Sequence, residues 1–85
     1  MNISKQEQRA LHTLAQGGVI LIERNGLRKV VAVNCVNRDG WYMNGFSVDL
    51  FRKLKKRRFI ASRGGGPYRV TLHGLSSVRA QLDNR

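Results

Sequence analysis

The sequence predicts an α+β fold in a single domain spanning residues 1–85, with elements in the order α-β-β-β-α-β-β-α. Three observations predict this class. Apolar residues recur at the 3.6-residue spacing of a helix in three separate segments, short runs of branched side chains lie between them, and glycine-containing turns separate the runs. A chain of 85 residues buries only about 60% of the surface that its unfolded form exposes, so we expect one modest core.

The first helix is predicted over residues 5–16 by a capping box. Ser4 and Glu7 have the spacing at which each side chain accepts a hydrogen bond from the backbone amide of the other. Gly17-Gly18 predicts the end of the helix, because glycine readily takes the left-handed conformation found there. The apolar positions of this helix fall on one face: Ala10, Leu11, Leu14 and Ala15.

Three short strands are predicted to follow as an antiparallel meander. Branched residues predict strands over 19–22 and 29–37. Asn25-Gly26 predicts a two-residue hairpin between them, because both residues tolerate a positive φ. Asp39-Gly40 predicts a second tight turn, after which residues 41–43 form the third strand.

The second half is predicted to contain a helix over 48–57, a hairpin of strands at 59–62 and 68–70 around a glycine-rich turn, and a last helix capped by Thr71. Gly74 is expected to weaken that last helix by about 1 kcal/mol relative to alanine. Four residues of the last helix have the spacing of a core-facing stripe: Leu72, Leu75, Val78 and Leu82.

The charge of the chain is large and unevenly distributed. Sixteen Lys and Arg against five Asp and Glu give a net charge of +11. Between Leu50 and Leu82 nine basic residues occur without one acidic residue. Such a field attracts nucleic acid, an anionic membrane or an acidic protein, and it raises the rate of encounter.

The densest part of this charge is the run from Arg52 to Arg58. Many such runs are simply solvated helix faces. Here, however, like charges at i,i+3 and i,i+4 repel by a few tenths of a kcal/mol each, and no acidic residue within the run relieves them. We therefore predict a surface for a polyanionic or acidic partner, with eight contact residues: Arg52, Lys53, Lys55, Lys56, Arg57, Arg58, Arg63 and Arg69.

Other chemistry has little support in the sequence. His12, His73 and Cys35 form no recognisable metal set, and the carboxylates are scattered, so we expect no catalytic or metal site, no cofactor and no enzyme activity. The three glycines at 64–66 match neither nucleotide-binding fingerprint. Cys35 is predicted to be a buried thiol. With no membrane-spanning or secretory segment in the pattern, we expect a cytoplasmic protein without a membrane partner.

The second half also has the arrangement of a winged-helix domain. In that fold one helix enters the major groove of DNA, and the following β-hairpin, the wing, reaches the backbone or the minor groove. The first four basic residues of the run would then lie on the recognition helix, and Arg63 and Arg69 on the wing. The meander stands where a second short helix would complete the helix-turn-helix, so base-specific reading is not implied.

Three stretches resemble the small bacterial YjhX family: NISKQEQRALHTLAQGG, DLFRKLKKRRFI and PYRVTLHGLSSVRAQLDNR. The resemblance runs over nearly the whole chain. It implies a non-enzymatic, toxin-like inhibitor of DNA topoisomerase I, paired with a cognate antitoxin encoded nearby. The resemblance gives no mapped inhibitory residues. The main alternative is a winged-helix DNA-binding transcriptional regulator, and a third hypothesis is an RNA- or ribosome-associated basic protein.

Overall fold

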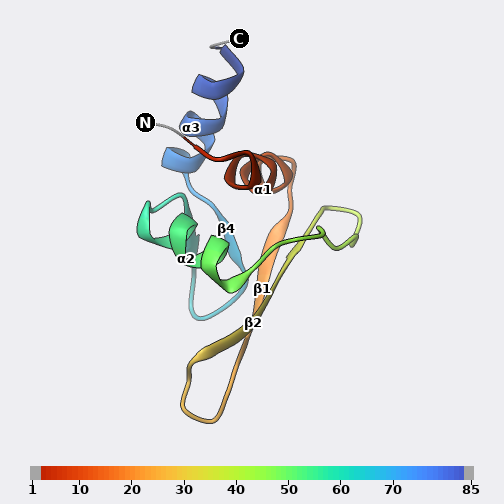
Figure 1. The fold of residues 1–85 in the computed structure, drawn as a ribbon, viewed down its shortest axis with the longest axis vertical. Coiled ribbons are helices and arrows are strands. Elements are labelled where there is room, and N and C mark those ends of the chain that lie inside the picture. The colour runs from red at the N-terminus through yellow and green to blue at the C-terminus, as the bar shows by residue number, and fades with distance from the viewer. Residues whose placement is uncertain (1–2, 84–85) are drawn as a thin grey trace.

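A computed structural model describes the backbone of residues 3–83 and the side chains of residues 3–78. Over these residues the chain forms three helices and a four-stranded antiparallel sheet of order β2-β1-β4-β3, so the predicted α+β class is confirmed (Figure 1). The elements are α1 (Lys5–Ala15), β1 (Val19–Arg24), β2 (Val30–Val36), α2 (Val48–Lys56), β3 (Ile60–Ser62), β4 (Tyr68–Val70) and α3 (Leu72–Asp83).

The predicted capping box of α1 is confirmed. The Ser4 hydroxyl accepts from the Glu7 amide at 3.1 Å, and the Glu7 carboxylate accepts from the Ser4 amide at 3.3 Å. Gly17 takes a φ of 101° at the end of the helix, as predicted. Gly18 lies so close to β2 that a Cβ there would meet the Val36 carbonyl oxygen at 2.7 Å. The glycine pair therefore both ends the helix and lets the chain turn tightly into β1.

The predicted two-residue hairpin at Asn25-Gly26 is wrong in detail. The Asn25 amide donates to the Lys29 carbonyl and the Arg28 amide donates to the Asn25 carbonyl, which makes a three-residue loop. Arg28 takes the positive φ, at 62°, and Gly26 does not. This loop is the three-residue type in which a turn is followed by a left-handed residue. The pattern of residues correctly located the hairpin, but not the residue that takes the left-handed conformation.

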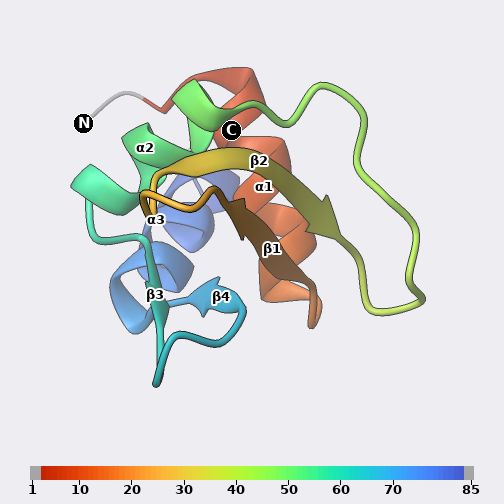
Figure 2. The ribbon, with the colours of Figure 1, turned by 90° about the horizontal axis from the view of Figure 1, so that it is seen from below.

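The predicted third strand over 41–43 is also wrong. Only one isolated bridge, between Val36 and Tyr42, forms there, so the observed order is α-β-β-α-β-β-α. Trp41 and Tyr42 are 74% and 63% exposed, so neither gains the burial that would hold a strand against β2. Figure 2 shows this connection swinging out beside the sheet before it returns to α2.

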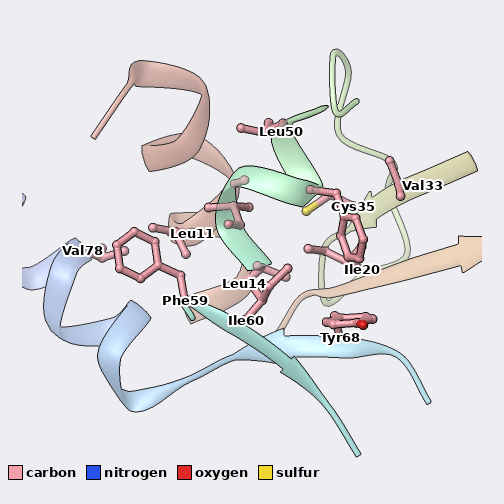
Figure 3. Packing of buried hydrophobic residues seen from close by; sticks show 13 residues of the cluster. Leu11, Leu14, Ile20, Val33, Cys35, Leu50, Phe59, Ile60, Tyr68 and Val78 are labelled. Atoms are coloured by element: carbon pink, nitrogen blue, oxygen red, sulfur yellow. The ribbon is translucent and has the colours of Figure 1, made fainter. Parts of the chain in front are cut away.

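The core lies between one face of the sheet and the helices. Ile20 pairs in register with Cys35 on one side and with Tyr68 on the other, and all three side chains are buried. The opposite face of the sheet carries the exposed residues Leu21, Ala61 and Arg69. Figure 3 shows the sheet side chains meeting residues of the helices that are all buried: Leu11, Leu14, Leu50 and Val78.

The start of α3 is fastened to the junction between α2 and β3. The Thr71 hydroxyl accepts from the Gly74 amide at 3.1 Å, which confirms the predicted cap, and it donates to the Arg58 carbonyl at 2.8 Å. The Thr71 amide donates to the Phe59 carbonyl at 2.8 Å. Leu72, predicted to face the core, is 83% exposed because this cap turns it outward, whereas Val78 is buried. The side chain of Leu82 lies outside the described residues.

Cys35 is a buried thiol, as predicted. Its side chain is fully inaccessible, and burial raises the pKa of the thiol from its ordinary value of 9.0 to about 11. The unfolded chain loses the thiol proton at a lower pH than the folded protein does. The contribution of Cys35 to the free energy of unfolding is therefore fully present below pH 9 and is lost as the pH rises toward 11.

We therefore expect Cys35 in the native protein to resist alkylation by iodoacetamide at pH 8, since the reactive thiolate is scarce and inaccessible. Mass spectrometry of alkylated samples with and without 6 M guanidinium checks this. Equal alkylation rates in both samples would contradict the burial of the thiol.

Candidate partner-binding surface

Helix α2 is held in one rotational setting by its cap and its buried side. The Ser47 hydroxyl accepts from the Leu50 amide at 3.1 Å, which fixes the first turn. Leu50, Phe51 and Leu54 are at most 4% exposed and lie on the core side. The remaining circumference then carries four exposed basic residues, which we call the α2 face: Arg52, Lys53, Lys55 and Lys56.

The members of the α2 face are not equivalent. Arg52 and Lys56 are four residues apart, so they lie one above the other and point away from the core. Lys55 lies on the side nearer the sheet, with its Nζ 5.9 Å from the centroid of the Tyr68 ring on β4. Tyr68 in turn packs edge-on against Phe51 at 5.0 Å. A cation–π contact over a supported aromatic ring restrains Lys55, whereas Arg52 and Lys56 extend into solvent.

Arg57 differs from the rest of the run because it pairs with a residue of α1. Its Nε lies 3.5 Å from Oε2 of Glu7, whose side chain is only 3% exposed, and its guanidinium lies 5.9 Å from the centre of the Phe59 ring. The other oxygen of Glu7 is already used in the capping box. Arg57 therefore joins the start of α1 to the end of α2, and the sequence pattern gave no sign of this pairing. Its predicted contact with a partner stays a prediction.

Arg58 has an unusual backbone conformation for a non-glycine residue, with a φ of 61°. Its amide donates to the Lys55 carbonyl at 3.0 Å, and the amide of Phe59 donates to the Leu54 carbonyl at 3.1 Å. This pair of bonds is a Schellman motif, in which the left-handed position is usually glycine. Arginine there costs about 1 kcal/mol of backbone strain. The side chain is exposed, so its charge is presented to solvent at the end of the α2 face.

We expect the substitution Arg58→Gly to separate stability from binding. Glycine relieves the left-handed strain, so the free energy of unfolding should rise by about 0.5–1 kcal/mol in a urea titration. Affinity for the partner should fall, because one exposed cation is lost. Arg58→Asn is the matched control, since asparagine tolerates the same φ and also lacks the charge. Unchanged partner affinity in both variants would show that Arg58 is not part of the partner-binding surface.

The two basic residues of the β3–β4 hairpin lie together on a different side. The Gly66 amide donates to the Arg63 carbonyl, and Gly64 and Gly65 both take positive φ, which is a tight turn of type I′. Arg69 pairs in register with Ala61 and is exposed on the outer face of the sheet. Arg63 and Arg69 border the same surface hollow of about 520 Å³.

Seven of the eight predicted residues therefore form two basic surfaces and not one, and the eighth, Arg57, pairs with Glu7. Helix α2 contacts β2 and β3, and its buried side faces the core. Arg69 lies on the opposite face of the sheet. The structure brings together the four residues of the α2 face with Arg58, and separately it brings together Arg63 and Arg69.

Two exposed aromatic residues lie outside the basic run, on the connection between β2 and α2. Trp41 and Tyr42 were expected in a strand, yet both project from the connection between β2 and α2. Exposed Trp and Tyr are the residue types that most often dominate binding energy in protein interfaces. The sequence offered one sign that Trp41 and Tyr42 are exposed. A three-residue strand directly after the turn at Asn37–Trp41 can bury little of its side-chain surface.

No group of three His, Cys, Asp or Glu side chains that could hold a metal ion occurs among the described residues. Within residues 3–83, no helix is both long enough and apolar enough to cross a membrane. The side chains of the two basic surfaces are arginine and lysine, which bind anionic groups through charge-assisted hydrogen bonds.

The whole chain, residues 1–85, matches the model of the YjhX toxin family, described as "Putative toxin of bacterial toxin-antitoxin pair". Among curated relatives, the chain is similar to a UPF0386 protein of Rhizobium rhizogenes (58% identity) and to one of Parvibaculum lavamentivorans (55%), each over the full length of both chains. A UPF0386 protein of Caulobacter vibrioides is 53% identical over the whole chain and 93% of its own length. No solved structure matches.

Proposed function

Because the chain belongs to the YjhX toxin family, we propose that it is a toxin that inhibits bacterial DNA topoisomerase I. The observation that carries this proposal is the α2 face: four exposed cations, fixed in place by a buried helix side, with one acidic residue, Asp49, in the first turn of the same helix. The inhibitor meets the enzyme, or the enzyme bound to DNA, through this face and the adjacent Arg58. The proposed target works on chromosomal DNA, which places the inhibitor in the cytoplasm.

The proposed mechanism is occupation of a site and not catalysis. A topoisomerase at work holds DNA, so its surroundings offer phosphate oxygens and acidic side chains that arginine and lysine bind with charge-assisted hydrogen bonds. The field of a chain with net charge +11 speeds the encounter with such a surface. Inhibition should then depend on the number of molecules bound, and it should reach completion near one inhibitor per enzyme.

The cognate antitoxin is the second partner in this proposal. The simplest way to neutralise such an inhibitor is to cover the α2 face, which would require an acidic surface on the antitoxin. Trp41 and Tyr42 are exposed on the connection between β2 and α2 and offer a second place for contact, since Trp and Tyr commonly anchor protein interfaces.

A binding measurement tests whether the target is the enzyme or its DNA. Purified topoisomerase I is immobilised, and binding of the chain is recorded with the enzyme alone, with plasmid alone and with the two together. We expect saturable binding in at least one sample that contains the enzyme. This binding should be tighter than binding to plasmid alone. Binding to plasmid that equals or exceeds binding to the enzyme samples would exclude the enzyme as the target.

A DNA-binding regulator with a winged-helix arrangement is the second candidate, and one observation favours it. Strands β1, β4 and β3 are neighbours in that order, and the β3–β4 hairpin follows α2 directly, as a wing follows a recognition helix. A regulator would bind its operator at least about 1,000-fold more tightly than random DNA. To distinguish the two candidates, fragments bound by the chain are selected from a genomic library and then competed with random duplex. A selected fragment that binds about 1,000-fold more tightly than random duplex would favour the regulator.

A further inference from the structure

The β1–β2 hairpin ends in a basic, solvent-exposed tip that the α2 face does not include. It projects beyond the rest of the molecule, along the longest dimension of 44 Å (Figure 1). The apex residue, Leu27, is 78% exposed. The hairpin tip, as we call it, consists of Leu27 and three exposed cations around it: Arg24, Arg28 and Lys29.

The same chain contains a second turn with the same geometry, which makes a direct comparison possible. In the hairpin tip, the Asn25 side-chain oxygen accepts from the backbone amides two and four residues later, at 2.9 and 3.0 Å. In the turn that begins at Asn37, the same oxygen accepts from the equivalent two amides, both at 2.9 Å. The fourth residue of each turn is left-handed: Gly40 in one, with φ 92°, and Arg28 in the other, with φ 62°.

Arg28 thus occupies a position where this chain uses glycine in the equivalent turn. A strained residue that the local fold does not require is a reason to look for a role of its side chain. The Arg28 carbonyl accepts from the Arg24 guanidinium at 3.0 Å, which holds a second cation beside the apex. The tip therefore combines an apolar apex with positive charge on either side, and the Arg24 guanidinium is held in place by this bond.

We propose that the hairpin tip binds duplex DNA in the minor groove, with Leu27 pressed against a base step and the three cations on the flanking phosphates. Proteins that bend DNA from the minor groove use this combination of an apolar wedge with arginine and lysine. The pairing of strands supports the placement, because β1 and β4 are antiparallel and both hairpins therefore end at the same end of the sheet. Arg63, in the second hairpin turn, lies at that end too. The proposal concerns DNA alone and does not depend on topoisomerase I being the target.

The cations are tested by the salt dependence of binding to a fluorescent 20-base-pair duplex. Arg28→Gly keeps the turn and removes one phosphate contact, so affinity should fall about five- to tenfold at 0.1 M salt and the slope of log affinity against log salt should shrink by about 0.9. Arg38→Gln is the matched control, since it removes one exposed cation from the equivalent turn. Its affinity should stay within about twofold of the unsubstituted protein. Equal losses in the two variants, or no duplex binding at all at low salt, would overturn the proposal.

The wedge is tested by DNA bending. A fragment of about 120 base pairs is shorter than the persistence length of about 150, so its closure by ligase reports bending. The unsubstituted protein should increase closure several-fold, and the minor-groove ligand netropsin should abolish the increase. Leu27→Ser should retain the salt slope and lose the increase in closure. An increase that survives either Leu27→Ser or netropsin would show that the tip does not insert into the minor groove.

Discussion

Reversal of two charges on the α2 face and of the adjacent Arg58, by Arg52→Glu, Lys56→Glu and Arg58→Glu together, is expected to raise the concentration that half-inhibits topoisomerase I by at least about 100-fold. All three side chains are exposed, so the substitutions leave the core untouched. Each substitution removes an attraction of about 1 kcal/mol at contact distance, and three such losses alone give about 100-fold, to which the new repulsions add. Relaxation of negatively supercoiled plasmid, titrated with each protein, measures the effect, and circular dichroism checks the fold.

A second triple variant separates the effect of the α2 face from the effect of the net charge of the chain. Lys5→Glu, Arg9→Glu and Arg38→Glu change the net charge by the same amount at three exposed positions outside the α2 face. This control should inhibit within about fivefold of the unsubstituted protein. If both triple variants lose inhibition equally, long-range attraction by the total charge would explain the activity, and the α2 face would have no special role.

Gly74→Ala is expected to destabilise the fold by about 1–3 kcal/mol, although helix propensity alone predicts a gain of about 1 kcal/mol. A Cβ at this position would lie 2.5 Å from the Phe59 carbonyl oxygen and 2.7 Å from a methyl group of Val70. One of these neighbours is backbone, so α3 would have to move outward. That movement would break the Thr71 bonds to the α2–β3 junction. Urea unfolding followed by circular dichroism gives the change in the free energy of unfolding.

Ser76→Ala is the control within the same helix. Ser76 is exposed, so alanine there should leave stability unchanged or raise it by a few tenths of a kcal/mol. A Gly74→Ala protein as stable as the Ser76→Ala protein would mean that α3 does not dock closely on the α2–β3 junction.

The sequence predicted most elements because their signals are local. The capping box at Ser4 and Glu7, the cap at Thr71 and the glycine pair at 64–65 each act over a few residues, and all appear in the structure. The strand at 41–43 failed because a strand needs a neighbour to bury its side chains, and neighbours are set by the tertiary fold. For the same reason, the pattern did not reveal that Gly74 is required by the close approach of Phe59.

The candidate site was predictable to a similar degree. The spacing of Leu50, Phe51 and Leu54 indicated which side of α2 is buried, and the four cations of the α2 face are exposed as that side requires. The pairing of Arg57 with Glu7 joins residues that are distant in sequence, so no local pattern could indicate it. The left-handed conformation of Arg58 was also hidden, because glycine is the residue that normally marks such a position.

Inhibition through the α2 face is tested most directly by titrating topoisomerase I with the unsubstituted protein in the plasmid relaxation assay. Relaxation should stop near one inhibitor per enzyme, and the charge-reversed variant at Arg52, Lys56 and Arg58 should leave relaxation intact at the same concentration. Relaxation that continues unchanged at a large molar excess of the unsubstituted protein would contradict the proposed function.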